Sequence, residues 1–81
     1  MSFLLNDNIT EEIQRKIYFI TSKLCIPPSR IIDYGESDVQ VNWYTNGRSY
    51  MWRSMAHGKK MDWVEVYDGS EKTWSIDIAC L

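Results

Sequence analysis

The chain has 81 residues, a formal net charge of −2, 44% hydrophobic residues and 14% aromatic residues. This length fits one small domain spanning residues 1–81, with no room for a second domain or a deep cleft. The ordinary charged and apolar fractions argue against disorder. The acidic balance argues against a general nucleic-acid binder, because such proteins carry a basic surplus.

The charge is unevenly distributed along the chain. Up to Lys60 there are eight Lys and Arg against six Asp and Glu, whereas the remainder has one Lys against five Asp and Glu. Two interpretations follow. The acidic part forms a solvated sheet edge that resists pairing with other chains, or it faces a basic partner.

A helix is predicted to begin after residues 1–8 and to end at residues 25–28. Its apolar stripe repeats at helical spacing and consists of Ile9, Ile13, Ile17, Ile20 and Leu24. Asn8 is the first candidate N-cap, with Glu11 completing a capping box, and Thr10 is the alternative. Two successive prolines, Pro27 and Pro28, end the helix.

Residues 39–52 are predicted to form a hairpin about Asn46-Gly47, because a type I′ turn needs positive φ at both central residues. A two-residue loop places Trp43 opposite Tyr50 and Val41 opposite Trp52. Side chains alternate along a strand, so one face of the hairpin is core. That face consists of Val39, Val41, Trp43, Tyr50 and Trp52.

The register of the next strand depends on the turn at residues 57–60. A three-residue loop with Gly58 in the left-handed region places Tyr50 opposite Val66 and Trp52 opposite Val64. We prefer this register because the alternative buries the Glu65 carboxylate without a partner. The residues then expected to point away from the core are Met61, Trp63, Glu65 and Tyr67.

The last predicted strand alternates cleanly, with Trp74, Ile76, Ile78 and Cys80 on its inner side. Residues 30–34 are ambiguous between a strand and a crossing segment. The sequence thus predicts a two-layer α+β domain: one N-terminal helix packed on an antiparallel β-meander of four strands, or five if residues 30–34 join.

No combination of residues indicates catalysis or a cofactor. His57 is the only histidine and lies in a turn, and the three Cys and His residues are too far apart for zinc. Cys25 and Cys80 are expected to be reduced, buried thiols. Residues 1–5 are too short for a signal peptide or membrane span, so we expect a cytoplasmic protein. Because no catalytic or metal-ligand set is present in the sequence, we expect it to be non-enzymatic and without metal.

The candidate binding surface is the sheet face turned away from the helix, since one helix covers only one face. Trp, Tyr, Met and Arg are enriched at protein interfaces. The candidate binding residues on this face are Trp63, Tyr67, Met51, Arg53, Met55 and Tyr44. Residues 3–5 packing back onto the face, or scattered exposed aromatics, are the structural alternatives.

Two functions are compatible with this surface. The first is a module that binds another protein, or a second copy of itself as a homodimer. Its small size, acidity and lack of a catalytic set are typical of inhibitors and host-takeover factors encoded by phages and mobile elements. The alternative is a single-stranded nucleic-acid binder that stacks bases on the aromatics. Its phosphate contacts would be Arg48, Arg53, Lys59 and Lys60.

Overall fold

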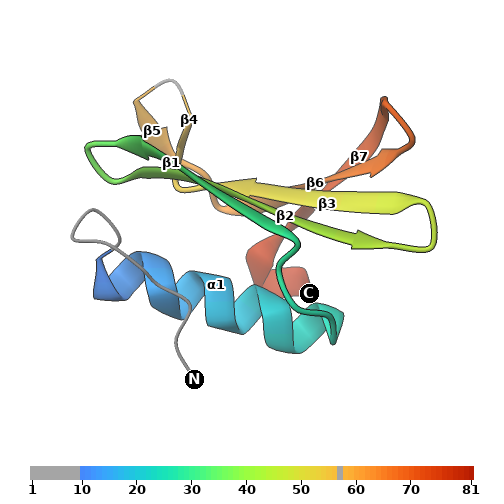
Figure 1. Ribbon diagram of the computed structural model, residues 1–81, viewed down its shortest axis with the longest axis horizontal. Coiled ribbons are helices and arrows are strands. Elements are labelled where there is room, and N and C mark those ends of the chain that lie inside the picture. The colour runs from blue at the N-terminus through green and yellow to red at the C-terminus, as the bar shows by residue number, and fades with distance from the viewer. Residues whose placement is uncertain (1–9, 57) are drawn as a thin grey trace.

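The computed structural model describes residues 10–56 and 58–81, so Asn8 and His57 lie outside the described residues. The elements in chain order are α1 (Glu11–Leu24), β1 (Arg30–Gly35), β2 (Asp38–Thr45), β3 (Arg48–Arg53), β4 (Met55–Ala56), β5 (Lys59–Lys60), β6 (Trp63–Asp68), β7 (Glu71–Asp77) and the 3₁₀ turn η1 (Ile78–Cys80). An antiparallel sheet of five strands in the order β1-β2-β3-β6-β7 lies over α1 (Figure 1). The predicted two-layer α+β fold is confirmed, with residues 30–34 as a strand.

Helix α1 begins at Thr10, whose Oγ1 accepts a hydrogen bond from the Ile13 N–H at 3.3 Å. This is the alternative cap of the sequence analysis. The helix ends where Cys25 adopts a left-handed conformation with φ of 61° and its N–H bonds to Thr21 O. Ile13, Ile17 and Ile20 are buried against the sheet, so this part of the predicted stripe faces the core, while Ile9 lies outside the described residues.

The central hairpin has the predicted register, with Val41 paired with Trp52 and Trp43 paired with Tyr50. Asn46 and Gly47 both have positive φ, 48° and 77°, as a type I′ turn requires. Trp43 is fully buried, and its indole N–H donates to Thr21 Oγ1 at 3.0 Å. Sheet and helix are therefore joined by apolar packing and by this partly buried hydrogen bond.

The connection from β3 to β6 differs from the predicted three-residue loop, although Tyr50 does pair with Val66. The chain leaves the sheet after Arg53 and forms a separate two-stranded ladder, β4–β5, before returning. This excursion breaks the strand alternation before Trp63. Met61 is consequently buried rather than outward, and its carbonyl accepts the indole N–H of Trp52 at 3.0 Å.

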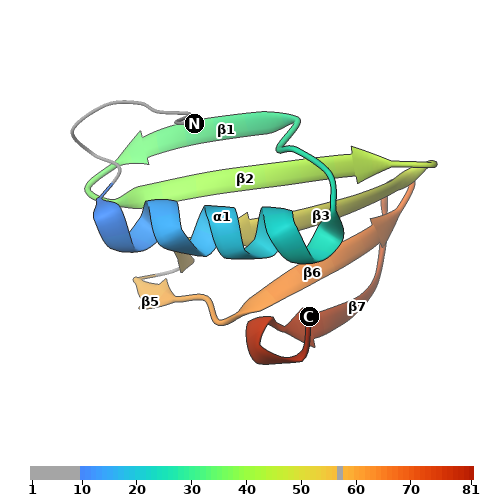
Figure 2. The same cartoon turned by 90° about the horizontal axis from the view of Figure 1, so that it is seen from below.

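The predictions for the C-terminal strand are partly wrong. Val64 pairs with Ile76 and Val66 with Trp74, yet Trp74 is 41% exposed. Helix α1 runs along β2 and β3 and leaves the edge strand β7 to one side (Figure 2). The strand also ends at Asp77, because η1 follows. Cys80 in η1 and Cys25 at the helix terminus are both exposed, not buried in the core.

Candidate functional site

The outer face is the side of the five-stranded sheet opposite α1, and its side chains form rows across the strands. One row joins Tyr44, Ser49 and Tyr67 through their pairings, and the next joins Asn42, Met51 and Glu65. Tyr44 and Trp63 are exposed. Five of the six candidate binding residues lie on this face: Tyr44, Met51, Arg53, Trp63 and Tyr67.

Met55 is the exception among the candidate residues. It pairs with Lys60 in the β4–β5 ladder and therefore does not belong to the outer face. The cause is the departure of the chain from the sheet at Ser54. Ser54 Oγ accepts the Val39 N–H at 2.7 Å and donates to Ser37 O at 2.6 Å.

Glu65 organises the aromatic residues of the outer face. Its Oε1 accepts the Tyr67 hydroxyl at 2.9 Å, while Oε2 accepts the Trp63 indole N–H at 3.4 Å. Lys72 Nζ pairs with the same Oε2 at 3.4 Å. The Glu65 side chain is only 17% exposed. One carboxylate therefore orients two of the candidate binding residues, Trp63 and Tyr67.

Partial burial is the largest influence on the pKa of Glu65 and raises it. The hydrogen bonds from Tyr67 and Trp63 and the charge of Lys72 outweigh that effect, so the net pKa is lowered from its ordinary value. Burial raises the pKa of the Tyr67 phenol, and the hydrogen bond to Glu65 raises it further. Near neutral pH the pair is therefore a charged acceptor and a neutral donor.

Arg53 is held in place at the other side of the face. Its guanidinium donates two hydrogen bonds of 2.9 Å to the Asp38 carboxylate and stacks 4.2 Å from the Tyr34 ring centroid. A bidentate pair of this kind fixes the side chain and neutralises its charge. Tyr34 was not predicted to lie on the outer face, because residues 30–34 were ambiguous between a strand and a crossing segment. As a strand residue two positions after Ile32, it lies on the same side as Ile32, which pairs with Gln40 of the outer face.

The four basic residues proposed to hold phosphates do not gather on the outer face. Arg48 lies on the helix side of the sheet, where it pairs with Asp68 and stacks on Trp74 at 4.9 Å. Lys59 and Lys60 belong to the β4–β5 ladder. Only Arg53 lies among the aromatics, and it is paired with Asp38.

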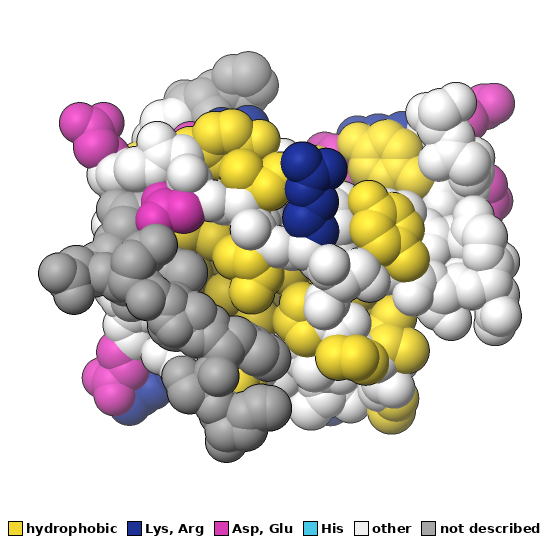
Figure 3. All heavy atoms as spheres, viewed as in Figure 1, with side chains coloured by type: hydrophobic (Ala, Val, Ile, Leu, Met, Phe, Trp, Pro, Cys, Tyr) yellow, Lys and Arg dark blue, Asp and Glu magenta, His cyan; other side chains and the backbone are white. Residues whose placement is uncertain are grey.

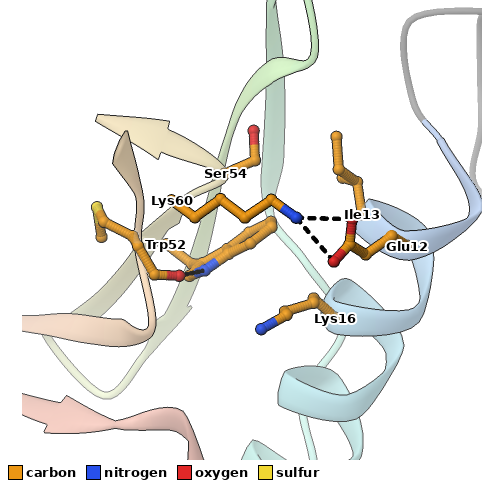
Figure 4. Close-up of a pocket in the computed structure, with 7 residues that line it drawn as sticks. Glu12, Ile13, Lys16, Trp52, Ser54 and Lys60 are labelled. Carbon is orange, nitrogen blue, oxygen red and sulfur yellow. Dashed lines mark hydrogen bonds and ion pairs between the residues drawn. The ribbon is translucent and has the colours of Figure 1, made fainter. Parts of the chain in front are cut away.

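Lys60 closes a small cavity between the first turn of α1 and the β4–β5 ladder. Its Nζ bonds both Glu12 carboxylate oxygens at 2.8 Å, and its stem passes over Trp52 (Figure 4). The cavity holds about 20 Å³. That is room for one water molecule and not for a substrate, so the cavity is not a candidate catalytic site.

The β1 edge of the sheet has a mixed surface. Hydrophobic side chains are scattered over this view from the sheet down toward α1, with a Lys or Arg side chain among those on the sheet side (Figure 3). Within residues 10–56 and 58–81, no group of three His, Cys, Asp or Glu could hold a metal ion. In the same ranges no helix is long and apolar enough to cross a membrane.

No protein-family model matches this chain, and comparisons with curated proteins and with solved structures likewise find no match.

Proposed function

We propose that this protein is a non-enzymatic protein-binding module that occupies its partner's surface with the outer face of its sheet, as an inhibitor or takeover factor does. The observation that carries the proposal is the composition of this face. It presents Trp63, Tyr44 and Tyr34 to solvent beside half-buried Met51 and Tyr67. Helix α1 covers the opposite side of the sheet (Figure 1).

The charge pairing of two basic residues on the outer face supports a protein partner over a nucleic acid. Arg53 and Lys72 are each paired with a carboxylate, whereas Arg30, opposite Asn42 on the same face, is exposed. A strand of phosphates needs cations that are free to replace its counterions. An apolar protein surface instead needs aromatic anchors in a neutral setting, where truncating one anchor commonly costs about 2 kcal/mol or more.

The experiment compares partner capture by three immobilised proteins: the wild type, the double variant Trp63→Ala with Tyr67→Ala, and Trp74→Ala. Trp74 is a matched control because it is an exposed tryptophan on the helix side of the sheet. The double variant should keep its fold and lose the captured protein, whereas Trp74→Ala should retain it. Sedimentation velocity of the same proteins detects the case in which the partner is a second copy.

Two results would contradict the proposal. Capture that survives the double variant would show that the outer face is not the binding surface. Binding that depends on the face but weakens steeply with salt, and that is competed by oligothymidylate, would support the nucleic-acid alternative instead.

A further inference from the structure

The outer face contains a slot between two tyrosine rings. Ser49 pairs with Tyr44 on one side and with Tyr67 on the other, so the three residues form one row across β2, β3 and β6. Directly opposite residues in a sheet have neighbouring Cβ atoms on the same face. Because serine is the smallest member of the row, the two rings stand on either side of a gap.

The structure contains this gap as an open groove on the outer face. Its walls and floor come from β2, β3, β6 and the β6–β7 turn. The principal lining residues are Gln40, Asn42, Tyr44, Ser49, Met51 and Tyr67. The Tyr67 wall is fixed through its hydrogen bond to Glu65. The Tyr44 wall is 54% exposed and is reached freely from solvent.

The floor of the groove is polar at one end. Tyr34 donates to Gln40 Oε1 at 3.4 Å, and the Gln40 amide donates to Asn42 Oδ1 at 3.0 Å. These two hydrogen bonds fix the orientation of the Asn42 side-chain amide. Its Oδ1 accepts from Gln40, and its NH₂ group is the last donor of the series. Among the described residues, that NH₂ group donates to no partner. It is suited to a carbonyl oxygen of an arriving chain.

The lining contains no Lys, Arg, Asp or Glu side chain. Arg30 lies exposed beside the groove, opposite Asn42, so burying a cationic group there would leave that group without a partner, at considerable cost. Two aromatic walls and a methionine favour an apolar or aromatic side chain. The site therefore disfavours a cationic occupant and suits an apolar or aromatic one.

We propose that the slot between Tyr44 and Tyr67 receives one uncharged aromatic or branched aliphatic side chain from an extended segment of a partner protein, with Asn42 donating to that segment's backbone. This inference depends on the proposed function, because it names the chemistry that the outer face recognises. Trp63 lies outside the slot and provides contact area beside it.

The test is a ¹⁵N chemical-shift titration of the full chain with N-acetyl-tryptophan amide and N-acetyl-leucine amide. The comparison probes are N-acetyl-lysine amide and oligothymidylate. The apolar amides should shift the backbone signals of Ser49, Met51 and Tyr67 and saturate in the millimolar range, and the comparison probes should not. No saturable shift at these signals, or equal shifts with the lysine probe, would overturn the inference.

A variant that fills the slot with a larger side chain tests the inference directly. Ser49→Tyr places a third ring in the gap and should weaken the apolar probes at least about tenfold. Tyrosine is well tolerated in strands, and Ser49→Leu serves if the first variant fails to fold. Ser75→Tyr is the matched control. Ser75 lies on β7, pairs with Glu65 of β6 and does not line the groove. Unchanged probe binding in both folded Ser49 variants would overturn the inference.

The two proposals fail in different ways. If Trp63→Ala with Tyr67→Ala abolishes partner capture while Ser49→Tyr does not, the outer face binds the partner without using the slot. If neither change affects capture, the proposed function itself is wrong.

Discussion

The Tyr67 hydroxyl donates a 2.9 Å hydrogen bond to Glu65 Oε1, two residues earlier on the same side of β6. The same carboxylate also accepts a hydrogen bond from the Trp63 indole N–H. The orientation of both aromatic residues thus depends on one ionised group. This dependence gives the candidate surface a property that can be measured without a partner.

The first prediction concerns the phenol of Tyr67. Burial and the hydrogen bond to Glu65 both raise its pKa, so its absorbance change should come late in an alkaline titration. Glu65→Gln removes the negative acceptor and should lower that pKa toward its ordinary value, while burial continues to raise it. Unchanged ionisation of the tyrosines in Glu65→Gln would contradict the hydrogen bond.

The second prediction concerns acid. The folded pKa of Glu65 lies below its ordinary value of about 4.5, so ionised Glu65 stabilises the fold fully above that value. The stabilisation is lost as the pH falls through the folded pKa. Denaturant unfolding should therefore show wild type more stable than Glu65→Gln at pH 6 to 7, with the difference shrinking steadily below about pH 4.5. A difference that is independent of pH would contradict the charge pairing.

The third prediction concerns the core under the sheet. Ile17 is 1% exposed in the middle of α1, so Ile17→Ala should lower the free energy of unfolding by about 2–5 kcal/mol. The control is Phe19→Ala in the same helix, whose ring is exposed and which should change stability much less. Chemical denaturation of both variants measures the difference. Equal effects would mean that the apolar stripe of α1 does not pack against the sheet.

The fourth prediction concerns the hairpin turn. Gly47 has φ of 77°, and a Cβ at this position would meet nothing within 4 Å. Any penalty is therefore conformational, since β-branched residues tolerate positive φ poorly. Gly47→Val should destabilise by about 1–2 kcal/mol, and Gly47→Asn by less, because asparagine tolerates the left-handed region. Two variants of equal stability would contradict the type I′ turn.

The parts of the fold that could be predicted are those determined by local rules. The Asn46-Gly47 turn determines the register of β2 and β3, and alternation then divides core from outer face. Keeping Glu65 out of the core correctly placed Val64 and Val66 inside and Trp63 outside. A single unpaired charge was enough to choose between registers, because its burial is so costly.

The parts that could not be predicted depend on contacts between distant residues. The β4–β5 excursion is only two residues long on each side, too short for a periodic signal, so Met55 and Met61 were both misplaced. The exposure of Trp74 follows from how far α1 extends across the sheet, and that of Cys80 from the end of β7 at Asp77. Neither can be predicted from strand alternation. Ser49 could not be predicted as a site residue from the sequence. A small residue forms the floor of a slot only when large residues lie opposite it on both neighbouring strands.

The last prediction concerns Ser54, where the chain leaves the sheet. This serine is buried, its Oγ accepts the Val39 N–H, and its own N–H donates to Val39 O at 2.8 Å. Ser54→Ala leaves the Val39 N–H buried without that acceptor and should cost about 1–3 kcal/mol of stability. The control Ser75→Ala removes an exposed hydroxyl from β7 and should change stability by less than about 0.5 kcal/mol. Denaturant unfolding measures both, and amide exchange should show the Val39 proton losing protection only in Ser54→Ala. If the two variants are equally stable, the Ser54 hydroxyl does not determine where the chain leaves the sheet. The backbone hydrogen bond between Ser54 and Val39 would then be sufficient to end β3.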